Sequence, residues 1–239
     1  MLVEVEHLSL GYERQAVLHD ISFQIEEKDF IIVLGSNGVG KSTLVKGMLG
    51  LIKPIEGKIT YHIDNIGYMP QETRVDPNFP ASVLEVILSG FINKVGIRPF
   101  YNKNEKKKAL EIMEILKITD LKKKIFSELS GGQRQKVLLA RSLCATENLL
   151  ILDEPSNNLD QKSKSEFYTT LKHLNEGHNI TILMITHDID NDSLIGNKVL
   201  ALSQDGYYFG KTDDYLEATL WYSIFSRCSP INLWFMPLL

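Results

Sequence analysis

Apolar and charged residues alternate at the start of the chain. Positions 3–8 carry valines and a leucine with glutamates between them, and positions 17–26 repeat this alternation. A period of two is typical of a strand with one buried face. The next run, Phe30–Leu34, is apolar throughout and ends at a glycine, which predicts a strand buried on both faces. Positions 58–61 and 66–69 predict two further strands.

The period becomes helical in two places. Positions 41–49 fit a helix that Gly50 and Pro54 end. Between about positions 81 and 145, apolar residues recur at helical spacing on two faces, one with Val83, Val86, Ile87 and Phe91 and another with Leu110, Met113, Ile115 and Leu116. We therefore expect a helical lobe over about residues 72–145, inserted into a core of strands and helices.

Three apolar runs follow the lobe. Positions 149–152, 180–185 and 199–202 are candidates for buried strands, and segments long enough for helices separate them. Such alternation implies a largely parallel sheet with helices on both faces. The predicted fold class is therefore α/β.

Composition excludes some classes of function. The 239 residues are 44% hydrophobic and 23% charged, as in ordinary soluble globular proteins. A net charge of −4 argues against a general nucleic-acid-binding surface. The basic clusters at 103–108 and 122–124 are interpreted as solvent-exposed helix faces or ends. Cys144 and Cys228 match neither a zinc site nor a disulfide framework, which favours a reducing cytosol. We expect neither a secretory signal nor a membrane-spanning segment.

A glycine-rich segment follows the first buried run. Residues 35–42, Gly-Ser-Asn-Gly-Val-Gly-Lys-Ser, fit the pattern G-x-x-x-x-G-K-[ST]. Glycines let backbone amides approach a polyphosphate, and the following helix points its positive end at the same anion. Lys41 supplies a charge to the β and γ phosphates, and the Ser42 hydroxyl can ligate Mg²⁺. A chance turn is disfavoured by the strand before it and the helix after it. The predicted phosphate site consists of Gly35, Ser36, Asn37, Gly38, Val39, Gly40, Lys41, Ser42 and Thr43.

Two carboxylates end the apolar run at 149–152. Ligands of open α/β sheets bind at the carboxyl ends of the strands, where Asp153 and Glu154 stand. Asp153 can hold Mg²⁺ directly or through water, and Glu154 can accept a proton from an attacking water. An apolar run that ends in two acids is common by itself. Its position 112 residues after Lys41 favours the catalytic interpretation.

A third motif, Leu-Ser-Gly-Gly-Gln at 129–133, opens a predicted helix that runs to about residue 145. Its serine and two glycines form another candidate anion cradle, although such a motif alone is more often only a helix cap. A protein with two phosphate cradles either binds two ligands or shares one between subunits. The residues concerned are Ser130, Gly131, Gly132 and Gln133.

These three elements, in this order and spacing, resemble the ATP-binding-cassette (ABC) ATPase family, whose signature is LSGGQ. Four smaller motifs match as well: Tyr12 stands where the family has an aromatic residue that stacks on adenine, Gln71 fits the Q-loop, Asn158-Leu159-Asp160 fits the D-loop and His187 fits the switch histidine. The resemblance covers about residues 1–215. It implies a P-loop NTPase core with a mainly parallel sheet, an N-terminal antiparallel β subdomain and an inserted α-helical subdomain.

The resemblance also implies the chemistry. ATP and Mg²⁺ are the expected cofactors, with Tyr12, the P-loop, the LSGGQ residues and Asp160 around the nucleotide. Cassettes of this family pair head to tail, so that the LSGGQ of one covers the ATP of the other. One P-loop and one signature therefore imply a homodimer or a paired cassette. The implied catalytic residues are Glu154, which activates water, His187, which holds the γ-phosphate, and Gln71, which senses the metal or the water. The implied Mg²⁺ ligands are Ser42, Gln71 and Asp153.

Positions 74–90 narrow the expected transport role. Asp76, Phe79-Pro80 and Gly90 are similar to the cassettes of zinc and manganese uptake systems, although iron-chelate cassettes carry similar patterns. The resemblance implies an ATPase subunit at the cytoplasmic face of the membrane that powers metal import through a separate integral membrane permease. An extracytoplasmic solute-binding protein is the expected indirect partner, and no nucleic acid is expected.

Several alternatives stay open at this stage. They include a cassette for an iron chelate, an efflux ATPase and a ribosome-associated factor, since the run at 157–160 is similar to those factors. A DNA-repair ATPase is disfavoured because no long coiled coil separates the two halves. The tail at 216–239 departs from the family: it carries both tryptophans, and prolines interrupt it. We expect it to pack on the core or on a second copy, or to contact a membrane surface or a partner, or to be a frayed or altered C-terminus.

Overall fold

The computed structural model describes residues 1–13, 15–71, 80–95, 98, 100–146, 148–157, 159–187 and 195–225. Several predictions from the sequence concern residues outside these ranges. They are Asp76 and Phe79 of the metal-uptake pattern, Asn158 of the D-loop, and the part of the C-terminal tail beyond residue 225.

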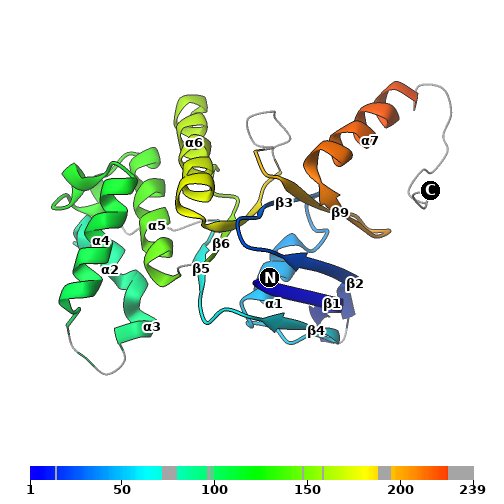
Figure 1. The fold of residues 1–239 in the computed structure, drawn as a ribbon, viewed down its shortest axis with the longest axis horizontal. Helices are drawn as coiled ribbons and strands as arrows, with labels where there is room; N and C mark the ends of the chain where they lie inside the picture. Colours follow the sequence, from blue (N-terminus) through cyan, green and yellow to red (C-terminus); the bar gives the residue numbers. More distant parts are fainter. Residues whose placement is uncertain are drawn as a thin grey trace.

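The N-terminal residues form a three-stranded antiparallel sheet of order β2-β1-β4 (Figure 1). Its strands are β1 (Val3–Tyr12), β2 (Gln15–Ile25) and β4 (Glu56–Tyr61). The apolar positions of β1 are buried while its glutamates are only partly covered, as a period of two requires. The expected antiparallel β subdomain is therefore confirmed.

The second sheet has six strands in the order β5-β6-β7-β3-β8-β9. Five of them are parallel: β3 (Phe30–Gly35), β5 (Ile66–Met69), β6 (Leu149–Asp153), β7 (Thr181–Ile185) and β8 (Lys198–Leu202). Every residue of β6 and β7 is buried, which explains their unbroken apolar runs. The sequence did not predict β9 (Tyr207–Lys211), an antiparallel edge strand whose residues are half-buried or exposed and show no alternation.

Helices cover both faces of this sheet, as predicted (Figure 1). Alternate residues of β3 show the division: Ile31 and Val33 pack in one core with α1 (Lys41–Met48) and the N-terminal sheet. Phe30 and Ile32 pack in a second core with α5 (Gly131–Ala145) and α6 (Gln161–His178). The P-loop helix and the LSGGQ helix therefore lie on opposite faces of the sheet.

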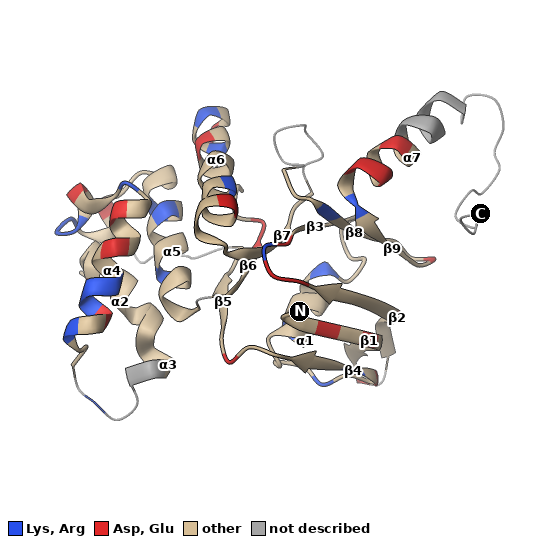
Figure 2. Ribbon diagram, in the orientation of Figure 1, with Lys and Arg blue, Asp and Glu red and all other residues tan. Residues whose placement is uncertain are grey.

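The predicted helical lobe contains α2 (Val83–Leu88), α3 (Ile92–Val95) and α4 (Lys103–Ile115), and α2 and α4 pack against α5. Ser82 and Asn102 begin α2 and α4 with capping boxes. Three short 3-10 helices complete it, at Ser89–Phe91, Thr119–Leu121 and Phe126–Glu128. Lysines and acidic residues are interspersed along its helices (Figure 2). Most lysines of the predicted basic clusters are exposed.

Helix α7 (Thr212–Phe225) follows β9 and contacts β8 and β9. The expected boundary between the cassette and its tail, at residues 215 and 216, therefore falls inside a helix. Within the ranges described above, no helix combines the length and the apolar character needed to cross a bilayer.

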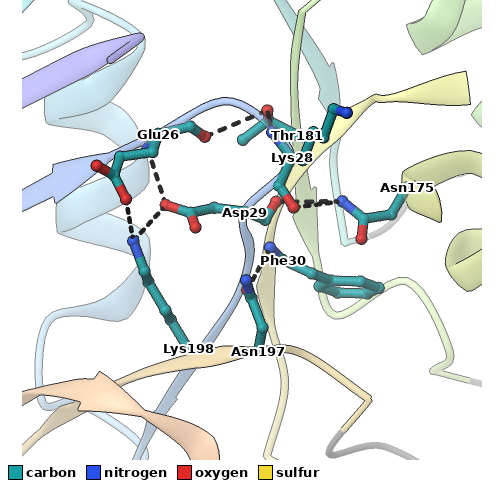
Figure 3. A network of polar contacts seen from close by, with 8 residues as sticks. All are labelled: Glu26, Lys28, Asp29, Phe30, Asn175, Thr181, Asn197 and Lys198. Atoms are coloured by element: carbon teal, nitrogen blue, oxygen red, sulfur yellow. Dashed lines mark hydrogen bonds and ion pairs between the residues drawn. The ribbon is translucent and has the colours of Figure 1, made fainter.

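A polar network ties strands together at the amino ends of β3, β7 and β8 (Figure 3). Lys198 Nζ donates to Glu26 and to Asp29, both at 2.9 Å, and the Phe30 amide donates to Asn197 Oδ1 at 2.8 Å. Asn175 Nδ2 donates to the carbonyls of Lys28 and Ile180. The candidate site lies at the opposite side of the sheet, at the carboxyl ends of the parallel strands.

Candidate functional site

The P-loop joins the end of β3 to the start of α1. Gly38 and Gly40 adopt φ of +83° and +111°, in the left-handed region that favours glycine. A Cβ at Gly40 would also lie 2.6 Å from Leu18 Cδ2, so a larger residue there would force the buried Leu18 side chain to shift. No side chain caps α1 and no acidic residue lies in its first turn. Its first amides are therefore open to an anion.

Lys41 is 7% exposed and crosses back over the loop. Its Nζ donates to the carbonyls of Gly35 at 2.6 Å and Ser36 at 3.0 Å. Ser42 is exposed while Thr43 is buried. The remaining rim of the loop, Ser36, Asn37 and Gly38, is exposed, whereas the Val39 side chain packs in the core and leaves only its backbone for a ligand.

Asp153 and Glu154 stand at the end of β6, as the sequence predicted. Asp153 is 8% exposed, and burial raises the pKa of its carboxyl, as does the charge of Glu154, while the Lys41 ammonium opposes both. The influence of Lys41 on this carboxyl means that the P-loop and the end of β6 face one another. Glu154 adopts φ of +46°, which a residue with a Cβ rarely does.

Glu154 is the centre of a polar cluster. Gln71 Nε2 and Asn157 Nδ2 both donate to its Oε2, each at 2.5 Å. His187 Nδ1 lies 3.4 Å from its Oε1. Gln71 follows β5, Glu154 follows β6 and His187 follows β7, and these strands are neighbours next to β3. The structure thus brings the predicted catalytic residues together with the P-loop at one edge of the sheet.

Tyr12 ends β1 beside α1 and is 45% exposed. Lys46 Nζ donates to its hydroxyl at 3.1 Å and lies 5.4 Å from its ring centroid. Hydrogen bonds from Lys46 and Thr43 lower the pKa of the Tyr12 hydroxyl. An aromatic ring next to the P-loop helix is available to stack on a nucleotide base.

The LSGGQ turn begins α5 on the other face of the sheet. Ser130 is exposed and forms a capping box with Gln133. Asp160 begins α6, where its carboxylate accepts from Ser163 N at 3.0 Å and Ser163 Oγ at 2.7 Å. A Cβ at Gly132 would lie 3.2 Å from that same Ser163 Oγ. The LSGGQ turn therefore lies beside Asp160. Its helix α5 and the P-loop helix α1 of the same chain lie on opposite faces of the sheet.

Three residues at the site had no role in the sequence analysis: Lys46, Tyr68 and Asn157. Burial raises the pKa of the Tyr68 hydroxyl, and so does the charge of the nearby Asp153 carboxylate. Tyr68 lies three residues before Gln71 of the Q-loop, and Asn157 directly precedes the D-loop run at 158–160. The three-residue spacing of Asn157 from Glu154, which is that of a turn, was the available signal.

The donor set suits Mg²⁺. Ser42 offers a hydroxyl, Asp153 a carboxylate and Gln71 an amide oxygen, all of them the hard oxygen ligands that this ion prefers. An exposed Ser42 beside an open helix N-terminus leaves room for phosphate oxygens and water, with which Mg²⁺ usually completes its shell.

Comparison with known proteins agrees with this geometry. The sequence pattern of the ABC transporter family matches residues 18–157. The high-affinity zinc uptake system ATP-binding protein ZnuC of Bacillus subtilis is 35% identical over 211 residues, which cover 85% of this chain and 91% of that protein. The manganese transport system ATP-binding protein MntB of the same species is 34% identical over 219 residues, which cover 89% and 87%.

A solved structure, described as an inward-facing metal-chelate type ABC transporter, is also similar. It is 32% identical to this chain, with a TM-score of 0.84, and the match covers 94% of this chain and 88% of that one.

Proposed function

Because the chain belongs to the ABC transporter family and is one of its ATP-hydrolysing cassettes, we propose that it powers the import of zinc or manganese through a separate membrane permease. The observation that supports the activity is the cluster of Gln71, Glu154 and His187 beside the P-loop. The cargo is supported by the similarity to zinc and manganese uptake proteins.

Binding of ATP begins at the P-loop. The open amides of α1 would accept the phosphates, and Lys41 would exchange the carbonyls of Gly35 and Ser36 for phosphate oxygens. Ser42, Asp153 and Gln71 would hold Mg²⁺, which when bound neutralises charge on the β and γ phosphates. The Tyr12 ring would stack on adenine.

Hydrolysis needs a base and a positioned γ-phosphate. Glu154 would take one proton from water, whose oxygen then forms a bond to the γ-phosphorus. The bond from that phosphorus to the β–γ bridging oxygen breaks, and its electron pair leaves with ADP. His187 would hold the γ-phosphate, since it already lies 3.4 Å from Glu154 Oε1.

The active unit would be a homodimer or paired cassette. Because α1 and α5 lie on opposite faces of the sheet, a second cassette turned head to tail would bring its LSGGQ residues, Ser130 to Gln133, and its Asp160 to this P-loop. Residues 1–215 would form the cassette proper. In this proposal the tail has no assigned part.

The permease would bind the helical lobe near Gln71. Two apolar side chains of the lobe, Ile92 and Phe100, are 66% and 80% exposed and offer apolar contacts. The chain would then lie at the cytoplasmic face of the membrane, and an extracytoplasmic solute-binding protein would deliver the ion without touching it. The likeness to a metal-chelate type transporter supports one second candidate cargo, an iron chelate.

Uptake by metal-starved cells tests the cargo. Labelled zinc and manganese are supplied to cells that carry the wild-type chain, Lys41→Ala, or the exposed control Lys53→Ala. We expect Lys41→Ala to abolish uptake of one ion and Lys53→Ala to preserve it. Equal uptake of both ions in all three strains, with the permease present, would refute metal import and leave the ATPase activity standing.

A further inference from the structure

Glu154 is held in an unfavourable backbone conformation. Its φ of +46° lies in the left-handed region, which disfavours residues that have a Cβ. Such a conformation persists only where neighbours enforce it. The Glu154 amide donates to the Ile185 carbonyl of β7 at 3.0 Å, and the Asn157 amide donates to the Glu154 carbonyl at 3.2 Å. Asn157 thus closes the turn that carries the carboxylate.

The carboxylate itself is largely desolvated. The Glu154 side chain is 13% exposed, so its charge depends on hydrogen-bond donors from the protein. Among the residues that the structure describes, Gln71, His187 and Asn157 contact this carboxylate. Gln71 and His187 have other tasks in the proposed function, at the metal or water and at the γ-phosphate. Asn157 hydrogen-bonds to Glu154 through both its backbone and its side chain.

The two oxygens of the carboxylate are not equivalent. Both amide donors, from Gln71 and Asn157, reach Oε2, whereas Oε1 faces His187. A base that holds one oxygen in a fixed hydrogen bond can present the other to water in a constant direction.

We propose that Asn157 is the positioning residue of the catalytic base: its side-chain amide holds Glu154 Oε2 so that Oε1 receives the proton of the attacking water. The inference rests on the ATPase part of the proposed function and is independent of the cargo. It assigns Asn157 no contact with ATP, so its loss should lower turnover and leave nucleotide affinity nearly unchanged.

The test measures ATP turnover by the purified full chain and three variants. Asn157→Asp preserves size and turn propensity but replaces the amide donor with a charge that repels Glu154. Asn157→Ala removes the donor, and Asn157→Ser restores a shorter one. We expect kcat to fall about 10- to 100-fold in Asn157→Asp and Asn157→Ala, since a misplaced group can cost about that much. KM for ATP should stay within about threefold of the wild-type value, and Asn157→Ser should retain more activity than Asn157→Ala.

Two controls separate positioning from folding. Asn104→Asp makes the same charge change at an exposed site on α4 and should have the kcat and melting temperature of the wild type. In a Glu154→Ala background, Asn157→Ala should cause no further loss of turnover, because the group it positions is gone. Wild-type kcat in Asn157→Asp would overturn the inference. So would a loss matched by a rise in KM and a lower melting temperature, or a full additional loss in the double variant.

Discussion

Gln71 and Glu154 are joined by a hydrogen bond from Nε2 to Oε2 although they are 83 positions apart in the chain. The bond exists because β5 and β6 are parallel neighbours, so residues that follow the two strands meet at one edge. The bond links the proposed base of hydrolysis, Glu154, to Gln71, which precedes the helical lobe. A change at Gln71 on permease contact would therefore reach the base directly.

Glu154→Gln should preserve ATP binding and lower turnover by about 10²- to 10⁴-fold, because the amide cannot accept the proton of water. The ATP-bound pair should then accumulate, which gel filtration with and without ATP can measure. Glu114→Gln, at an exposed position on α4, is the matched control. Turnover near the wild-type rate in Glu154→Gln would remove Glu154 from the role of base.

Gly40→Ala should destabilise the chain and abolish ATP binding, since alanine meets both an unfavourable φ of +111° and Leu18 at 2.6 Å. The expected loss is about 2–4 kcal/mol from strain and overpacking together. Gly50→Ala is the control, because φ is +68° but no atom lies within 4 Å of its Cβ. It should cost about 1–2 kcal/mol. Urea unfolding and ATP titration measure the two variants, and equal losses would contradict the packing argument.

Tyr12→Ala should raise KM for ATP about 3- to 10-fold, the expected size of one lost stacking contact, with kcat little changed. Tyr12→Phe preserves the ring and loses the hydrogen bond from Lys46, so its KM should stay near that of the wild type. Steady-state kinetics on both variants would show whether the ring or the hydroxyl of Tyr12 contributes to ATP binding. If Tyr12→Phe were as impaired as Tyr12→Ala, the hydroxyl and not the ring would be the binding group.

Lys198→Met should lower the free energy of unfolding by about 1–3 kcal/mol at pH 7, because the buried Asp29 carboxylate loses its ammonium donor. The hydrogen bond from Lys198 lowers the pKa of Glu26 below its ordinary value of 4.5. A lowered carboxyl pKa contributes stability above that ordinary value, and this stability is lost as the pH falls through the folded-state pKa. The difference between wild type and variant should therefore shrink below about pH 4.5, as urea unfolding at several pH values would show. A constant difference would exclude the Glu26 contribution.

Several features of this protein followed from the sequence alone. The apolar runs of β3, β6 and β7 indicated buried strands, because they are short and their residues have no polar face to offer water. The motif that contains Gly35, Lys41 and Ser42 predicted a strand, a tight loop and a helix. This prediction was possible because turn and helix conformations depend mainly on neighbouring residues in the sequence. The helical lobe followed from a period that the backbone itself imposes.

Only the tertiary structure decided which side chains share the site. The order β5-β6-β7-β3 places Gln71, Glu154 and His187 together, and no local pattern encodes the order of strands in a sheet. The edge strand β9 was not predicted, because its residues do not alternate between apolar and polar. It is a strand because it pairs with β8. Asn157 gained its role in the same way: its amide matters because the fold turns Glu154 into a left-handed conformation and covers its carboxylate. Local conformation could be predicted from the sequence, whereas contacts between residues far apart in the chain depended on the order in which the strands pair.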